Sequence, residues 1–239
     1  FAAGLGTRLR PLTDTMPKAM VPVAGRPLIE ICLHHLIEQG ASEVVVNVHH
    51  FAQQIIDYVN SHEWPIPIRI SNESEELLNT GGGLRKAGEL FTADGQPILI
   101  HNVDILSNAP IKDFYQNHLS HDATLLVSER NTQRYLLFDD DMRLRGWTNI
   151  ATGEVRSPFA NIEPEKLHRY AFSGIHMFSP RLFTRMQSYP KVFPIMDFYL
   201  NECAKADIRG CVQPNLQLMD VGKLNTLHEA EHFVNELGL

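Results

Sequence analysis

Two glycines and three cations lie close together near the start of the chain. Gly4 and Gly6 are followed by Arg8, Arg10 and Lys18. Because glycine has no Cβ and tolerates a positive φ, the backbone N–H groups of such a segment can converge on phosphate oxygens. The cations can neutralise the charge that builds up on a leaving pyrophosphate. These residues therefore predict a loop that binds a nucleoside triphosphate.

Two other phosphate-binding motifs fit this segment less well. The dinucleotide fingerprint Gly-x-Gly-x-x-Gly needs a third glycine at the position of Leu9. It also needs an acidic residue at the end of the second strand, where this chain reads Asn47-Val-His-His50. The P-loop pattern Gly-x-x-x-x-Gly-Lys-[Ser/Thr] does not occur in the sequence. An NAD-dependent oxidoreductase is therefore disfavoured, and a plain surface loop is the remaining alternative.

Two aspartates each follow a short apolar segment. Asp104 comes just after residues 97–101, and Asp220 follows residues 216–219. In an open parallel sheet, ligands gather beyond the carboxyl ends of the strands. Two carboxylates at that edge could hold Mg²⁺, which takes hard oxygen ligands and keeps several waters. Taken singly, an aspartate after a strand is more often a turn residue or a helix cap, so the spacing alone leaves both interpretations open.

Composition limits the class of protein. The chain has 239 residues, of which 44% are hydrophobic and 21% are charged, as in an ordinary globular domain. The net charge of −7 argues against nucleic-acid binding by general electrostatics. No apolar stretch is long enough to span a bilayer, so we expect no membrane partner. Three cysteines without Cys-x-x-Cys spacing suggest neither disulfides nor zinc, and hence a cytoplasmic location.

Apolar runs alternate with amphipathic segments along most of the chain. We expect strands at residues 43–48, 66–70, 97–101 and 170–178, and helices at 28–39, 51–60, 82–91, 180–187, 194–205 and 223–237. Leu224, Leu227, Ala230 and Val234 should face inward from the last helix. Strand-like segments at 123–128, 134–139 and 143–147 include a hairpin, and residues 150–169 form a long surface excursion. Phe1 should be the last residue of a buried strand, so we expect residues upstream of it.

This order of elements predicts an α/β fold. We expect residues 1–239 to form a single Rossmann-like domain, with a mostly parallel sheet, helices on both faces and a small antiparallel β insertion. Residues 1–110, approximately, would form a nucleotide-binding half, and residues 111–239 would form the half that binds the second substrate.

The opening segment resembles a known family. The run Ala2-Ala-Gly-Leu-Gly-Thr-Arg-Leu-Arg-Pro-Leu-Thr13, followed by Pro17-Lys18 and Val21-Pro-Val23, is similar to the signature of the sugar-1-phosphate nucleotidyltransferases. The resemblance continues, in the family's order, through Asn79-Thr-Gly-Gly-Gly83, Asn102-Val-Asp104, Phe172-Ser-Gly174 and Asp220-Val-Gly222. It implies a nucleotide-diphospho-sugar transferase fold, with a nucleoside triphosphate and a sugar-1-phosphate as substrates and Mg²⁺ as cofactor.

The resemblance also implies a role for each matching residue. Arg8 and Lys18 would be catalytic, and Asp104 and Asp220 would bind the metal. The nucleotide-binding residues would be Ala3, Gly4, Leu5, Gly6, Thr7, Asn79, Thr80, Gly81 and Asn102. The sugar-binding residues would be Phe172, Ser173 and Gly174. The chain departs from the family at Val103, where many relatives have a small residue. It also lacks a Glu-Lys-Pro element before the sugar-binding segment, so the sugar phosphate would be anchored in a different way or by Arg134 or Lys166.

The choice of substrates stays open among several alternatives. The short domain and its last motif are similar to family members that transfer a uridylyl group from UTP to N-acetylmuramate-1-phosphate in cell-wall recycling. A guanylyl- or cytidylyltransferase for mannose-like or heptose-like 1-phosphates is the alternative within the family. From another class, a non-catalytic regulator that senses nucleotide sugars should have lost its cations or aspartates, yet all four are present. The oligomeric state leaves no trace in the sequence.

Overall fold

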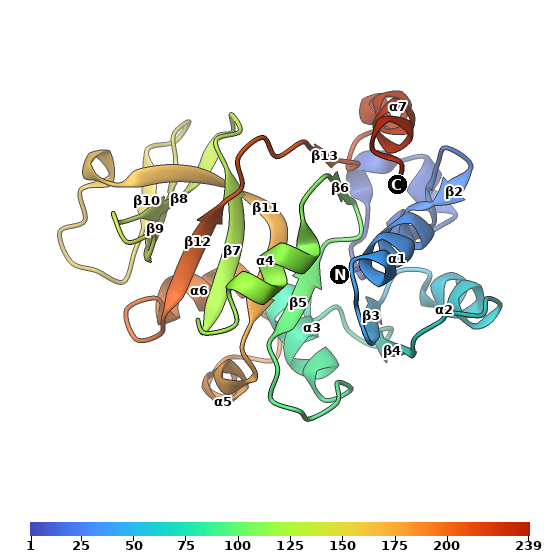
Figure 1. Cartoon of the computed structure of the whole chain (residues 1–239), viewed down its shortest axis with the longest axis horizontal. Helices are drawn as coiled ribbons and strands as arrows, with labels where there is room; N and C mark the ends of the chain where they lie inside the picture. Colours follow the sequence, from blue (N-terminus) through green and yellow to red (C-terminus); the bar gives the residue numbers. More distant parts are fainter.

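The computed structural model describes residues 1–239, with the side chain of Asn225 excepted. It is an α/β structure built around a seven-stranded sheet, which confirms the predicted fold class (Figure 1). The strands run in the order β10-β9-β8-β11-β7-β12. The long β11 pairs with β8 through its first residues and with β5 through its last four. These strands are β5 (Ile98–His101), β7 (Ala123–Ser128), β8 (Arg134–Phe138), β9 (Leu144–Asn149), β10 (Glu154–Arg156), β11 (His168–Phe178) and β12 (Ile208–Val212).

Three smaller strand pairs complete the sheet structure. They are β1 (Pro22–Val23) with β2 (Arg26–Pro27), β3 (Val44–Val48) with β4 (Ile68–Asn72), and β6 (Ile105–Ser107) with β13 (Leu218–Asp220). In Figure 1, β3 and β4 lie on one side of β5, together with α1 (Leu28–Glu38) and α2 (Ala52–Asn60), whereas β7 and β12 lie on the other side. The remaining helices are α3 (Asn79–Gly88), α4 (Ile111–Asn117), α5 (Phe183–Met186), α6 (Ile195–Glu202) and α7 (Leu227–Leu237).

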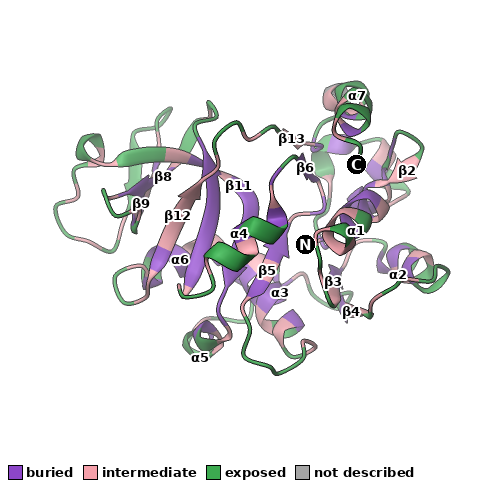
Figure 2. Ribbon diagram, viewed as in Figure 1, coloured by how far each residue is buried: buried purple, intermediate pink, exposed green. Residues whose placement is uncertain are grey.

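Helices cover both faces of the sheet because β11 is apolar on both. Met177 packs in one cluster with Phe114 of α4, and the next residue, Phe178, packs in another cluster with Phe198 of α6. Successive strand residues point to opposite faces, so this continuous apolar run needs a helix on each side. Burial falls from β7, which is buried throughout, to β10, which is exposed throughout (Figure 2).

The prediction of a mostly parallel sheet is wrong. Among the described strands, only β3 with β4 and β7 with β12 pair in parallel. The long β11 runs antiparallel to β5, β7 and β8, and the β8–β9–β10 hairpins add further antiparallel pairs. An apolar run indicates that a strand is buried, but it carries no information about the direction of the strand's neighbours.

Several element boundaries also differ from those predicted. The helix at 82–91 begins earlier, at Asn79, and the helix at 180–187 divides into the 3₁₀ turn Pro180–Leu182 and α5. Residues 150–169 contain β10, and α4, β6 and β12 were not predicted. The inward face of the last helix is confirmed at Ala230 and Val234, but Leu224 is 42% exposed. Leu224 lies in a 3₁₀ turn before α7, where the α-helical period no longer applies.

An apolar cavity of about 400 Å³ lies between β3 and β5. Its lining includes Cys32 of α1, Val46 of β3, Leu84 of α3 and Ile100 of β5. Phe1 reaches one end of it: the Phe1 amine donates to His101 O, and Phe1 O accepts from Val103 N at 3.0 Å. None of the predicted site residues lines this cavity, so it is separate from the candidate active site.

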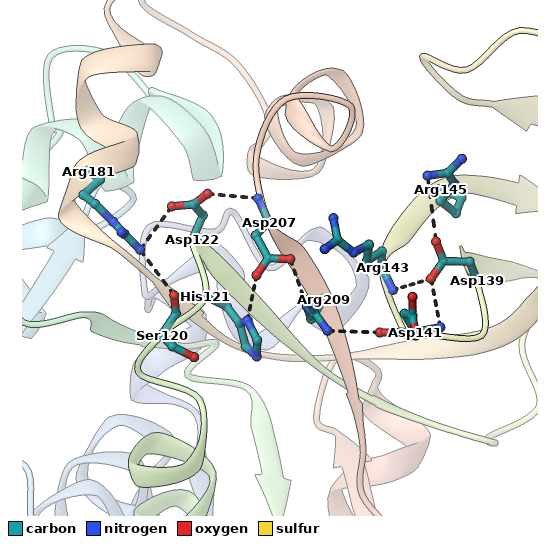
Figure 3. Close-up of polar contacts among 10 residues, drawn as sticks. All are labelled: Ser120, His121, Asp122, Asp139, Asp141, Arg143, Arg145, Arg181, Asp207 and Arg209. Carbon is teal, nitrogen blue, oxygen red and sulfur yellow. Dashed lines mark hydrogen bonds and ion pairs between the residues drawn. The ribbon is translucent and has the colours of Figure 1, made fainter.

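A network of ion pairs and hydrogen bonds joins the start of β7 to β12 and to the β8–β9 hairpin (Figure 3). Asp207 is its centre: it accepts from Arg209 Nε at 2.9 Å and lies 2.8 Å from His121 Nδ1. Partial burial would raise the pKa of Asp207, but the hydrogen bonds from Arg209 and His121 outweigh it and lower that pKa below 3.8. Asp207 therefore stabilises the fold in its charged form.

Replacing Asp207 with Asn should lower the free energy of unfolding at pH 6–7. Because the pKa of Asp207 is lower in the folded state, its contribution is complete above pH 3.8 and is lost as the pH falls through the folded value. The difference in the free energy of unfolding between wild type and Asp207→Asn, measured in urea, should therefore become smaller at acid pH. Asp113→Asn, at an exposed position of α4, is the matched control. A difference that is constant from pH 7 to pH 3 would contradict this role.

None of the described helices is long and apolar enough to cross a membrane.

Candidate active site

The loop after Phe1 folds back on itself through Gly6. Gly6 has φ +64°, and a Cβ there would lie 2.9 Å from Thr13 Cγ2 and 3.1 Å from Lys18 Cβ. The Thr13 hydroxyl donates to Gly6 O at 2.8 Å and holds this fold. Arg8 and Lys18 lie in two separate 3₁₀ turns, Thr7–Leu9 and Lys18–Met20. Gly6 therefore brings two segments of the loop into contact and lets both cations serve one site.

The four predicted charged residues form one cluster. Lys18 Nζ pairs with Asp104 and lies 3.9 Å from Asp220 Oδ1. Arg8 approaches the other oxygen of Asp220 at 3.7 Å. The two aspartates meet because β13 pairs with β6, and Val221 N donates to Asp104 O at 2.8 Å. The sequence argument placed both at the ends of parallel strands, whereas the pairing that joins them is antiparallel.

Exposure increases across this cluster. The side chain of Lys18 is 11% exposed and that of Asp104 is 19% exposed, whereas Asp220 is 39% and Arg8 is 57% exposed. The Lys18–Asp104 pair thus forms the floor of the site, and Arg8 lies at its mouth. Charge interactions are stronger away from water, so Lys18 is the less screened of the two cations.

The two aspartates offer suitable oxygens for Mg²⁺. Asp220 Oδ1 is buried, makes no hydrogen bond and lies 3.9 Å from Lys18 Nζ, which leaves this carboxylate oxygen open to a further partner. Mg²⁺ is commonly held by one or two carboxylates and completes its shell with waters and substrate phosphates. Among the described residues, no three His, Cys, Asp or Glu side chains gather to enclose a metal ion. The two carboxylates therefore fit an open Mg²⁺ site, in which waters and substrate phosphates would supply the remaining ligands.

Cys32 does not qualify as a nucleophile. Its Sγ lies 3.6 Å from His101 Nδ1. Burial raises the pKa of the Cys32 thiol to about 11 and lowers the pKa of His101 to about 4, so both groups are neutral at pH 7. A reactive cysteine needs the opposite shift, toward the thiolate.

Three of the predicted nucleotide-binding residues, Asn79, Thr80 and Gly81, lie at the start of α3, and we call them the base-binding segment. Asn79 has φ +60°, and its side chain accepts from Thr80 N at 2.8 Å. Thr80 Oγ1 accepts from Ile195 N, and Gly81 N donates to Phe193 O, so the segment is tied to α6 and to the residues before it. A nucleotide-binding role for Gly81 would require a ligand to approach this segment closely. The structure gives Gly81 a protein neighbour instead, since a Cβ there would lie 2.3 Å from the Phe193 ring.

The predicted sugar-binding segment lies on β11 at a break in its pairing with β7. Gly174 O accepts from Asn102 N at 3.1 Å, which connects this segment to one of the predicted nucleotide-binding residues. Ser173 Oγ is buried without a hydrogen-bond partner. The cation that the structure brings here is Arg130, which donates to Phe172 O at 3.2 Å.

The sequence argument did not identify Arg130. It named Arg134 and Lys166, but Lys166 pairs with Glu163 at 2.8 Å in an exposed turn, and Arg134 lies in β8. Arg130 follows the buried strand β7 by two residues. Its place just past the end of a strand is the feature by which the sequence could have indicated Arg130 as a ligand-binding cation.

The fold and the cluster define an α/β protein whose glycine loop carries cations opposite two aspartates, a site suited to nucleoside phosphates. Comparison with known families makes this specific. The profile of the nucleotidyl transferase family matches residues 1–236, and the chain belongs to this family.

Curated relatives differ in what they act on. An N-acetylmuramate alpha-1-phosphate uridylyltransferase from Neisseria meningitidis serogroup B is 30% identical over 97% of this chain and 95% of its own length. Mannose-1-phosphate guanyltransferase beta-B from Xenopus laevis is 27% identical over 82% of this chain. The match covers 54% of the Xenopus protein, so the chain spans about half of its length.

A solved structure supports the fold. HddC from Yersinia pseudotuberculosis, in a complex with GMP-PN, superposes with a TM-score of 0.74 over 97% of this chain and 96% of that one. At 22% identity, this likeness speaks for the fold alone.

Proposed function

We propose that this protein transfers a nucleotidyl group from a nucleoside triphosphate to a sugar-1-phosphate and releases pyrophosphate. The observation that carries the proposal is the cluster of Arg8, Lys18, Asp104 and Asp220. Membership of the nucleotidyl transferase family supports it. A regulator with a degenerate site has no need to keep all four groups in contact, so the cluster favours an enzyme.

In the proposed reaction, a phosphate oxygen of the sugar-1-phosphate attacks the α-phosphorus in line with the leaving pyrophosphate. The α-phosphorus–oxygen bond to pyrophosphate breaks as the new one forms, and no covalent enzyme intermediate is needed. Lys18 neutralises charge on the transferring phosphate, and Arg8, at the mouth of the site, neutralises charge on the leaving pyrophosphate. Asp104 and Asp220 would hold Mg²⁺, which supplies further neutralisation of the phosphate oxygens.

The two halves of the chain would hold different substrates. Residues 1–110 contribute the phosphate loop at residues 3–7, the base-binding segment at 79–81 and Asn102. Residues 111–239 contribute the sugar-binding segment at 172–174. The bond from Asn102 N to Gly174 O supports a shared site, because it joins a residue of one half to a residue of the other.

For the particular substrates, we propose UTP and N-acetylmuramate-1-phosphate, in a cytoplasmic cell-wall recycling reaction. The Neisseria relative supports this choice, since it matches nearly the whole of both chains. A guanylyltransferase for mannose-1-phosphate is the second candidate, which the Xenopus relative favours.

One assay separates these candidates. Pyrophosphate release is measured with each of the four ribonucleoside triphosphates crossed with N-acetylmuramate-, mannose-, glucose- and heptose-1-phosphates. The proposal predicts release with UTP and N-acetylmuramate-1-phosphate above all other pairs. Release with GTP and mannose-1-phosphate alone would favour the second candidate, and no release with any pair would count against an active transferase.

Replacing Arg130 with Ala should raise the KM for the sugar-1-phosphate by about tenfold and leave the KM for the nucleotide within about threefold. The reason is that Arg130 is the cation beside the sugar-binding segment. Steady-state kinetics with each substrate varied in turn would measure both constants. Arg134→Ala is the matched control, and an effect of that variant in place of Arg130→Ala would assign the anchor to Arg134.

A further inference from the structure

A buried chain of hydrogen bonds connects Ala2, directly before the phosphate loop, to Leu78, directly before the base-binding segment. Ala2 N donates to Asn47 Oδ1 at 2.8 Å, and Asn47 Nδ2 donates to Glu73 Oε1, also at 2.8 Å. The other oxygen of Glu73 accepts from Leu78 N at 3.1 Å, directly before α3 begins. Four residues thus join the two parts of the proposed nucleotide site, although they are up to 76 positions apart in the sequence.

Glu73 is an unusual residue to find in this position. It is 1% exposed, and Asn47 is 5% exposed. Of the side chains that the structure describes, no Lys, Arg or His lies within ion-pair distance of Glu73, so N–H groups alone offset its charge. A buried carboxylate costs free energy unless its oxygens are hydrogen-bonded, and this arrangement occupies one oxygen with each segment.

The third glycine of α3 makes room for this chain of bonds. A Cβ at Gly83 would lie 2.7 Å from Glu73 Oε1 and 3.1 Å from Asn47 Nδ2. Such a contact would push the carboxylate away from Asn47. The glycine in the family motif is therefore explained at this position by close packing against Glu73 and not by a ligand.

The direction of every hydrogen bond in the chain is fixed. Backbone N–H groups at both ends can only donate, so Asn47 must present its carbonyl oxygen to Ala2 and its NH₂ to Glu73. The carboxylate accepts on both sides. Changing one partner alone puts two donors or two acceptors face to face.

We propose that Glu73 and Asn47 are positioning residues that hold the phosphate loop and the base-binding segment at a fixed separation. A nucleotide must contact both segments at once, so its affinity depends on this separation. The inference rests on the proposed function, and it deepens it: neither residue touches the substrate, yet both act on nucleotide binding.

The polarity of the chain allows a reciprocal test. Glu73→Gln places an amide NH₂ against either the NH₂ of Asn47 or the N–H of Leu78, and Asn47→Asp places two carboxylates together. In the double variant, the amide at position 73 donates to the carboxylate at position 47, and both backbone N–H groups keep an acceptor. Each single variant should raise the KM for the nucleotide by about tenfold or more, and the double variant should return it to within about threefold.

The matched control is Glu75→Gln, the same chemical change at an exposed position two residues away. It should leave both KM values unchanged. A role limited to stability would lower the free energy of unfolding in urea without a selective effect on the nucleotide KM. Equal changes in the KM values for nucleotide and sugar-1-phosphate, or a double variant no better than the singles, would overturn the proposal.

Hydrogen exchange of the ligand-free protein separates this inference from the proposed function. Each single variant should speed amide exchange in both residues 2–7 and residues 78–83, and the double variant should restore protection in both. If wild-type protein releases no pyrophosphate with any substrate pair, the proposed function fails. The exchange result still shows whether Glu73 and Asn47 couple the two segments. Faster exchange confined to the segment next to the substituted residue would overturn the inference that these residues couple the two segments.

Discussion

Replacing Lys18 with Met should lower kcat of the proposed transferase by about 100-fold or more and leave the fold intact. Lys18 Nζ lies between Asp104 and Asp220, and its side chain is 11% exposed. Its Cβ packs beside Gly6 in the folded loop, where Met has a similar length and can keep this contact. The variant therefore removes the charge but retains most of the packing.

The test needs both kinetics and a measure of folding. Pyrophosphate release gives kcat, and circular dichroism with urea unfolding shows whether the structure survives. The loss of Lys18 leaves Asp104 without its ion-pair partner, so some decrease in stability is expected. Adding Asp104→Asn to Lys18→Met should recover that stability without recovering turnover. Lys112→Met, at an exposed position of α4, is the matched control. Wild-type kcat in Lys18→Met would remove Lys18 from the mechanism.

The charged cluster could be predicted because each of its members belongs to a short motif. Arg8 and Lys18 lie within one loop, Asp104 lies between β5 and β6, and Asp220 ends β13, so local patterns place all four. Their meeting was predicted correctly from an incorrect topology. The sequence argument used parallel strands, whereas β6 and β13 pair antiparallel. The outcome is the same because both pairings deliver the two aspartates to one edge.

Residues that act through long-range contacts could not be predicted. Asn47 and Glu73 are 26 positions apart, and Arg130 and Phe172 are 42 apart, so no local period relates them. Gly83 illustrates the same limit. Its presence in a glycine-rich motif indicates close approach, but whether the approaching group is a ligand or Glu73 depends on how the end of β4 packs against α3. The direction of strands depends likewise on the course of the chain between them.

Asn substitutions at Asp104 and Asp220 should impair the use of Mg²⁺. Each variant removes one carboxylate charge but keeps the side chain's shape and one carbonyl oxygen. We expect the Mg²⁺ concentration for half-maximal rate to rise by about tenfold or more in each variant. Asp220→Asn should affect metal binding more selectively, because the ion pairs of Asp220 with Arg8 and Lys18 are long, at 3.7 and 3.9 Å. Asp104, in contrast, is hydrogen-bonded directly to Lys18. Asp104→Asn should therefore lower kcat further even at saturating Mg²⁺.

Titration of activity with Mg²⁺ would measure the metal requirement and kcat. Electron paramagnetic resonance of Mn²⁺, in the presence of a non-hydrolysable nucleotide, would measure metal binding separately. Asp113→Asn on α4 is the matched control, since it changes an exposed aspartate away from the cluster. If metal dependence and Mn²⁺ binding stay at wild-type values in both variants, the two aspartates do not hold the metal. Their contacts with Lys18 and Arg8 would then be their whole role, because those ion pairs alone would position the two cations on the phosphates.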